Sequence, residues 1–153
     1  MIAFFVAMAL AGGSTLEPPG RYRALSVNAH YGSALDTDSV VAEADLRHVK
    51  VLTVYFDQTV PDEAWRLYRF DVDCARHTLT ALGLAVYSAS GAVLADVDQP
   101  EPRTAQSISS GSNGDTLQQA VCGETAAAGD RFDTIQAFIA SARVHGPPIT
   151  QAH

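Results

Sequence analysis

The stretch Tyr68–Leu82, "YRFDVDCARHTLTAL", decides the fold because a cysteine lies within a run that alternates like a β-strand. Apolar side chains recur at every second position, so Phe70, Val72 and Cys74 are expected on one face of a sheet. The cysteine has three interpretations: a reactive centre, a metal ligand, or one half of a disulfide. These interpretations predict an enzyme, a metalloprotein and a rigid exported module respectively.

Spacing along the strand weighs against the first two interpretations. Asp71, Asp73, Cys74 and His77 have the chemistry of a soft-metal cluster. On a strand, however, positions 71 and 74 face opposite ways, as do 74 and 77. A thiolate nucleophile with His77 as its base meets the same objection, and it also needs a free thiol. We therefore expect no catalytic residue, no metal site and no cofactor here, and we favour the disulfide.

The second of the two cysteines, Cys122, lies at the end of a predicted helix. Ser112 with Asp115 three residues later is a capping-box pattern, and Gly123 is a suitable end. The apolar residues of this helix share one face by their spacing: Leu117, Ala120 and Val121. A cysteine on an inward strand position and one on a packing helix can be bridged if their Cα atoms approach to about 4.4–6.8 Å.

The rest of the first 100 residues predicts an antiparallel meander within an α+β fold. Consecutive segments have strand composition and short connections. Residues 30–41 ("HYGSALDTDSVV") contain turn formers before a brief strand at Val40 and Val41. The candidate strands are 22–27, 40–41, 47–56, 65–75, 78–88 and 92–97. Of these, 22–27 and 92–97 are the candidate edges, which are short and carry few charges.

A second helix is predicted over residues 130–146. Its apolar residues form a stripe at helical spacing: Phe132, Ile135, Phe138, Ile139 and Ala142. We favour a helix that covers the core over an exposed helix that docks a partner. Pro147 and Pro148 end the pattern.

Composition restricts the possible partners and the number of domains. A chain of 153 residues fits one domain with a real core. The net charge of −7 and the pI near 5.0 disfavour nucleic acid and anionic membrane surfaces. No stretch has the roughly 20 apolar residues of an integral membrane span.

The amino terminus predicts export. The apolar run Ile2–Ala11, followed by Gly12, Gly13 and Ser14, resembles the end of a secretory signal peptide. "TLEPPG" at 15–20 then reads as a linker. Export is a permissive context for a disulfide between two cysteines.

Four segments together resemble the surface-adhesin protein E family of Gram-negative bacteria: "YGSALDTDSVV", "WRLYRFDVDCARHTLT", "GAVLADV" and "SISSGSNGDTLQQAVCG". The resemblance covers about residues 22–123. It implies one antiparallel sheet of about six strands, with a C-terminal helix tied to its concave face by a Cys74–Cys122 disulfide, and a possible homodimer. The expected division is 1–20 signal remnant and linker, 21–123 adhesin-like domain, and 124–153 helical extension.

The resemblance also implies a function: an exported, non-enzymatic binding protein of the periplasm or cell surface, with a host matrix protein or an envelope protein as partner. The loop 57–64 ("DQTVPDEA") has three acids and no Lys or Arg, which disfavours electrostatic capture of an acidic ligand there. The alternative is a periplasmic small-molecule-binding or enzymatic domain that uses the groove between sheet and helix. Convergent polar side chains in that groove would favour the alternative, and a filled groove would favour the binding module.

Overall fold

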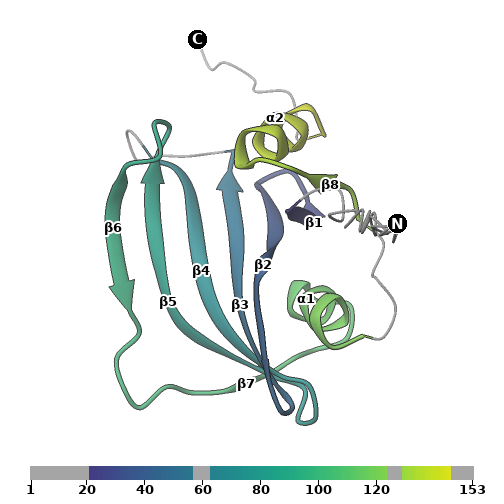
Figure 1. Cartoon of the computed structure of the whole chain (residues 1–153). Helices are drawn as coiled ribbons and strands as arrows, with labels where there is room; N and C mark the ends of the chain where they lie inside the picture. The colour runs from purple at the N-terminus through teal and green to yellow at the C-terminus, as the bar shows by residue number, and fades with distance from the viewer. Residues whose placement is uncertain (1–20, 57–62, 124–128, 146–153) are drawn as a thin grey trace, which may run out of the picture.

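The chain forms one antiparallel sheet with strand order β6-β5-β4-β3-β2-β1-β8, and β7 pairs with β5 (Figure 1). The computed structural model describes residues 21–56, 63–123 and 129–145. The long strands are β1 (Tyr22–Val27), β2 (Tyr31–Glu43), β3 (Leu46–Tyr55), β4 (Glu63–Asp73), β5 (Thr78–Ser88) and β6 (Val93–Asp98). The remaining elements are β7 (Gln106–Ser107), α1 (Asn113–Cys122), β8 (Arg131–Phe132) and α2 (Ile135–His145).

Among the described residues the sheet has eight strands, so the prediction of about six was too low. The first six strands follow each other in space as in sequence, as the meander predicts. The two additional strands have only two residues each. Such short strands carry no alternating pattern, and they form because tertiary packing lays them against β5 and β1.

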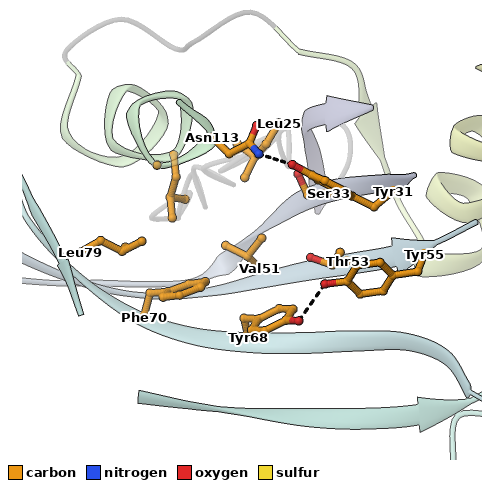
Figure 2. Close-up of a pocket in the computed structure, with 12 residues that line it drawn as sticks. Leu25, Tyr31, Ser33, Val51, Thr53, Tyr55, Tyr68, Phe70, Leu79 and Asn113 are labelled. Atoms are coloured by element: carbon orange, nitrogen blue, oxygen red, sulfur yellow. Dashed lines mark hydrogen bonds between the residues drawn. The ribbon is translucent and has the colours of Figure 1, made fainter. Parts of the chain in front are cut away.

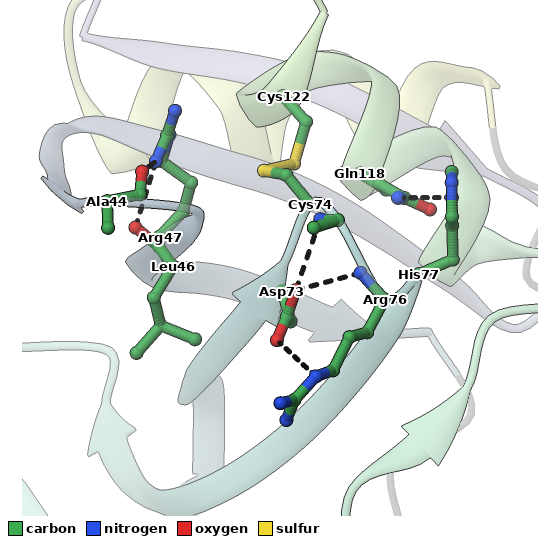
Figure 3. Close-up of a disulfide and its surroundings, with 10 residues drawn as sticks. Ala44, Leu46, Arg47, Asp73, Cys74, Arg76, His77, Gln118 and Cys122 are labelled. Carbon is green, nitrogen blue, oxygen red and sulfur yellow. Dashed lines mark hydrogen bonds and ion pairs between the residues drawn. A yellow bond between two sulfur atoms is a disulfide. The ribbon is translucent and has the colours of Figure 1, made fainter.

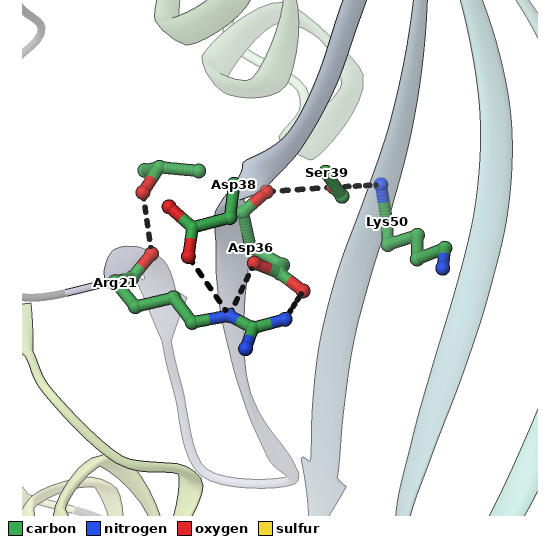
Figure 4. Close-up of polar contacts among 6 residues, drawn as sticks. Arg21, Asp36, Asp38, Ser39 and Lys50 are labelled. Carbon is green, nitrogen blue, oxygen red and sulfur yellow. Dashed lines mark hydrogen bonds and ion pairs between the residues drawn. The ribbon is translucent and has the colours of Figure 1, made fainter.

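β2 corrects the prediction of turns before a brief strand at residues 40–41. The strand is 13 residues long, although its register against β3 shifts between Asp36 and Val41. Ser39 stabilises this irregularity: its hydroxyl donates to the Asp36 carbonyl oxygen at 2.6 Å and accepts the Lys50 N–H at 2.8 Å (Figure 4). Turn-forming residues are therefore accommodated inside a strand, because a side chain supplies the backbone bonds that the ladder loses.

Both faces of the sheet are buried over part of their area, each by one helix. On β3, Leu52 and Val54 belong to one apolar cluster, whereas Val49 and Val51 belong to another. Neighbouring strand residues point to opposite faces, so the two clusters lie on opposite sides of the sheet. The first cluster contains Phe138 and Ala142 of α2, and the second contains Leu117 of α1.

The predicted helix over 130–146 is shorter than expected, because its first residues form a strand. Arg131 and Phe132 pair with β1, and α2 begins only at Ile135. Thr134 caps the helix, since its hydroxyl accepts the Ala137 N–H at 3.1 Å. Phe138 is 1% exposed, so α2 covers the core as predicted.

Two predictions fall largely outside the described residues. The signal remnant and linker at residues 1–20 lie outside them entirely. Of the acidic loop 57–64, only Glu63 and Ala64 are described, and they begin β4. Glu63 is buried and accepts a hydrogen bond from Nε of Arg66 at 2.8 Å, so this acid serves the fold.

Candidate functional site

Cys74 lies in the turn after β4, one residue beyond the strand in which it was predicted. Asp73 makes this turn: its Oδ1 accepts the N–H groups of Ala75 at 3.1 Å and Arg76 at 2.9 Å (Figure 3). His77 completes the reversal with a φ of 55°. The prediction of a longer strand was wrong because alternation continues through Cys74, while the aspartate redirects the backbone.

The structure joins Cys74 and Cys122 by a disulfide (Figure 3). Their Cα atoms are 5.6 Å apart, within the usual range for a disulfide. The bond ties the C-terminal end of α1 to the turn between β4 and β5. It therefore fixes the helix across one face of the sheet.

The polar residues near Cys74 do not converge on it. Nδ1 of His77 contacts Nε2 of Gln118 at 2.7 Å, whereas Oδ1 of Asp71 contacts Nδ1 of His48 at 2.5 Å. No group of three His, Cys, Asp or Glu side chains within residues 21–56, 63–123 and 129–145 is arranged to hold a metal ion. That the purified protein binds no metal stays a prediction, which elemental analysis checks.

The groove between α1 and the sheet is filled at one end and open at the other. Near the disulfide, Leu117 packs against Leu35, Val49, Val51 and Val72. Near the N-terminal end of α1 a hollow of about 190 Å³ remains (Figure 2). We call this hollow the tyrosine groove; its lining residues are Leu25, Tyr31, Ser33, Val51, Thr53, Tyr55, Tyr68, Phe70, Leu79, Asn113, Gly114 and Leu117.

Strand register brings the three tyrosines together. Tyr31 on β2 pairs with Tyr55 on β3, and Tyr68 on β4 pairs with Val51 on β3. Cross-strand partners point to the same face, so all three rings line the groove. Tyr68 also stacks on Phe70, with ring centroids 5.9 Å apart, which extends the aromatic floor along β4.

Each tyrosine hydroxyl has a polar partner at the wall of the groove. The hydroxyls of Tyr55 and Tyr68 lie 2.9 Å apart, and Nδ2 of Asn113 donates to the hydroxyl of Tyr31 (Figure 2). The guanidinium of Arg66 lies over the Tyr55 ring, 4.8 Å from its centroid. These contacts hold in place the three rings that line the hollow.

The chemistry of the tyrosine groove suits binding rather than proton transfer. Its twelve lining residues include no Asp, Glu, His, Cys, Lys or Arg. Burial raises the pKa of Tyr55 to about 12, and its hydrogen bond with Tyr68 adds to the rise. This phenol therefore stays protonated at neutral pH, where it is a hydrogen-bonding group and no base.

Sequence reasoning named a groove between the sheet and the helix but missed the three tyrosines that line it. Tyr55 and Tyr68 lie in segments rich in strand formers, where tyrosine is an ordinary residue, and Tyr31 lies in a segment that the sequence pattern assigned to turns. Only the β2–β3–β4 register places them side by side. The sequence shows whether each tyrosine stands at an odd or an even position of its strand. Which face of the sheet that position occupies is known only once the strand pairing is known.

The described part of the chain contains no helix that is long and apolar enough to cross a membrane. No curated protein matches the chain. Among solved structures, Haemophilus influenzae protein E is 16% identical, with a TM-score of 0.51 over 71% of this chain and 88% of that chain. Protein E from non-typeable Haemophilus influenzae is 14% identical, with a TM-score of 0.48 over 82% and 89%.

The first of these structures supports the fold alone, because its sequence identity is low. The model of the family described as "Surface-adhesin protein E" matches residues 22–123, about two thirds of the chain. The match includes β1 through β7, α1, both cysteines and all three groove tyrosines. On this match, the chain belongs to the surface-adhesin protein E family.

Proposed function

We propose that this chain is a non-enzymatic adhesin at the outer surface of a Gram-negative bacterium, and that it binds a host extracellular-matrix protein. Membership in the adhesin family is the observation that carries this proposal. The fold supports it, since the disulfide and two packed faces make a rigid platform suited to contact with a large partner.

We assign the contact to the tyrosine groove. Tyrosine provides a large apolar contact area together with a hydroxyl, and it loses little conformational entropy on binding. The volume of about 190 Å³ is below the roughly 300–1,000 Å³ of sites that enclose a small-molecule ligand. It suits one or two side chains inserted by a protein partner.

The test uses the oxidised full-length protein against a panel of purified matrix proteins, with envelope extracts as a second panel. Surface plasmon resonance should give saturable binding to at least one matrix protein. Tyr31→Ala should weaken that binding by about tenfold or more, since a single aromatic anchor often contributes 2 kcal/mol or more. Binding only to envelope components would contradict host adhesion, and binding to neither panel would contradict the proposal as a whole.

Tyr87→Ala is the matched control. Tyr87 is also a half-buried strand tyrosine, but it stacks on Trp65 in the cluster on the opposite face. Its removal should lower stability and leave matrix affinity unchanged. Equal loss of affinity in both variants would show that the groove has no special part in binding.

The proposed location is the cell surface rather than the periplasm. Family membership supports an exported or surface protein. Protease treatment of intact cells should therefore degrade this chain while a periplasmic marker survives. Survival of the chain until the outer membrane is broken would place it in the periplasm.

One observation favours the second candidate, a site for a small apolar molecule. A second hollow of about 340 Å³ adjoins the tyrosine groove and shares Phe70 and Leu79 with it. The second hollow alone reaches the roughly 300–1,000 Å³ of small-ligand sites, and the tyrosine groove enlarges it. A saturable thermal shift with small apolar compounds, abolished by Phe70→Ala, would support this candidate; no shift would exclude it.

A further inference from the structure

The pairing of β1 with β8 places two arginines directly opposite each other. Arg23 on β1 is the register partner of Arg131 on β8. Opposite residues of an antiparallel pair point to the same face, with Cβ atoms about 4.5–5.5 Å apart. Like charges in this arrangement repel each other, so the pair calls for a compensating group.

Neighbouring contacts hold this register firmly. The next pair, Tyr22 with Phe132, lies in the apolar cluster beneath α2, where Phe132 packs edge-on against Phe138. The Ala24 N–H also donates to the Asp130 carbonyl oxygen at 2.9 Å. The two arginines therefore remain opposite because the core fixes their backbones, whatever the charge repulsion costs.

The guanidinium of Arg23 is buried, and no carboxylate among the described residues neutralises it. The residue is 4% exposed, and its Nη2 atom has no hydrogen-bond partner in the described structure. Burial lowers the pKa of Arg23, and the charge of Arg131 lowers it further. A buried cation is costly unless an anion or several acceptors surround it.

Arg21, two residues earlier, differs from Arg23 because carboxylates lie beside its guanidinium. Its Nε and Nη2 atoms each donate to Asp36 at 2.8 Å, and Asp38 lies 3.5 Å from Nε (Figure 4). Arg21 is thus half-exposed, yet two carboxylates form ion pairs with it. Within the described residues, neither Arg23 nor Arg131 has a carboxylate at ion-pair distance.

We propose that Arg23 and Arg131 form a binding site for a single small oxyanion, a phosphate or carboxylate group. Guanidinium groups donate two parallel hydrogen bonds to such groups, and two arginines on one face present several donors together. Arg131 is exposed and provides access. The net charge of −7 opposes an extended polyanion, so one compact anionic group is favoured at this local positive site.

The test measures the melting temperature of the full-length protein in phosphate, sulfate or acetate, with chloride at equal ionic strength as reference. Phosphate or acetate should raise the melting temperature saturably by a few degrees, as expected for a ligand that binds the folded state. A larger response to phosphate and sulfate assigns a phosphate-type ligand, and a larger response to acetate assigns a carboxylate. Titration calorimetry should show that Arg131→Gln binds the preferred anion at least tenfold more weakly than the parent protein does.

Three variants separate a site from nonspecific screening. Arg76→Gln is the matched control, because the Arg76 side chain is 83% exposed and remote from the pair in the turn after β4. Arg23→Met should keep the packing of the aliphatic part of the side chain and abolish the response of the melting temperature to anions. In chloride, this variant should melt no lower than the parent protein. Glu124→Gln tests whether a carboxylate of this chain, outside the described residues, neutralises Arg23. This variant should leave the melting temperature in chloride unchanged.

Two outcomes would overturn the proposal. The first is that the anions do not raise the melting temperature, or that they raise it equally in the parent protein, Arg131→Gln and Arg76→Gln. An equal rise in all three would indicate salt screening and not a site. The second is a large drop in melting temperature for Arg23→Met that Glu124→Gln reproduces in chloride. That result would show that the chain neutralises Arg23 with its own carboxylate.

Discussion

At the residue scale, a few polar side chains decide where the backbone changes direction and which charges are compensated. Asp73 ends β4 by accepting two backbone N–H groups, which places Cys74 at the rim of the sheet beneath α1. Ser112 accepts the Asp115 N–H at 3.2 Å and begins α1. Together Asp73 and Ser112 orient the strand end and the helix that the disulfide joins.

The disulfide gives the first prediction. Cys74→Ser should lower the free energy of unfolding by up to roughly 4 kcal/mol, because the bond closes a loop with a sequence separation of 48. Urea titration of the parent and variant proteins measures this loss. Intact-mass analysis after thiol alkylation, without reductant, should show no alkylated cysteine in the exported protein. Two alkylated thiols in the natively folded protein would contradict the prediction.

His48 gives the second prediction. Its hydrogen bond with Asp71 raises its pKa above the usual value, and Glu43, 3.4 Å away, adds to the rise. The protonated imidazole therefore stabilises the fold fully below about pH 6.5, and this contribution is lost as pH rises through the higher folded-state pKa. An NMR titration should give a His48 pKa above 6.5.

Asp71→Asn should lower the His48 pKa more than Glu43→Gln does, because the Asp71 contact is 2.5 Å and the Glu43 contact 3.4 Å. Stability of the parent protein should exceed that of Asp71→Asn most at acidic pH, where the imidazole is charged. A His48 pKa at or below 6.5 would show that this contact does not form in solution.

At the element scale, the two helices play different roles on opposite faces. α1 covers the end of its face near the disulfide and leaves the tyrosine groove open beside its N-terminus. α2 seals the other face, where Phe138 and Ala142 pack over Gly32 of β2. A Cβ on Gly32 would lie 2.9 Å from the Ala142 Cβ, so glycine allows this close approach.

The third prediction concerns α2. Phe138→Ala should lower the free energy of unfolding by about 3–5 kcal/mol, because Phe138 is 1% exposed and its removal leaves a cavity. Val144→Ala is the control on the same helix: Val144 is 79% exposed, so its loss should change stability by less than about 0.5 kcal/mol. Equal effects in urea unfolding would mean that α2 does not pack as described.

Sequence patterns predicted those elements whose signals are local. Strand composition between short connections predicted the limits of β5, Thr78–Ser88, and the Ser112 cap with Gly123 predicted those of α1. β8 was missed because Phe132 fits a helical stripe equally well, and only contact with β1 makes it a strand. β2 was mistaken for turns because its bulge is stabilised by Ser39, which sequence alone also reads as a loop former. The tyrosine groove depends on register between three strands, so it could not be predicted residue by residue.

At the whole-molecule scale, the two ends of the sheet differ. β1 is covered in part by β8, whereas β6 ends the sheet, and all six of its residues are exposed. Three of these are large and apolar: Val93 at 58%, Leu94 at 49% and Val97 at 57% exposure. An edge of this kind is a template for pairing with another strand.

The charges that normally protect an edge strand are compensated in β6. Asp96 and Asp98 each accept a hydrogen bond from Arg69 of β4 at 2.8 Å. Their repulsion of a second copy is therefore reduced. Of the two predicted edges, the structure leaves β6 as the one suited to assembly.

The last prediction is a symmetric homodimer in which β6 pairs antiparallel with β6 of a second copy. Such a pairing satisfies backbone groups at the edge of both sheets and covers exposed Val93 and Val97. Light scattering of the full-length protein should give twice the chain mass. The double variant Val93→Lys/Val97→Lys should be a folded monomer, because lysines on an edge strand block pairing. Val144→Lys, which adds a lysine to a still more exposed valine on α2, should remain dimeric.

Deleting residues 130–153 separates this dimer from the alternative in which α2 completes a monomer. The deletion removes β8 and α2 but leaves β6 unchanged. If pairing occurs through β6, the parent protein is a dimer. The truncated chain is less stable because it loses Phe138, but it still dimerises. It becomes a monomer only when Val93 and Val97 are both replaced. A monomeric parent protein whose truncated form alone associates would contradict the prediction. It would show instead that the surface beneath α2, and not the β6 edge, is where two copies meet.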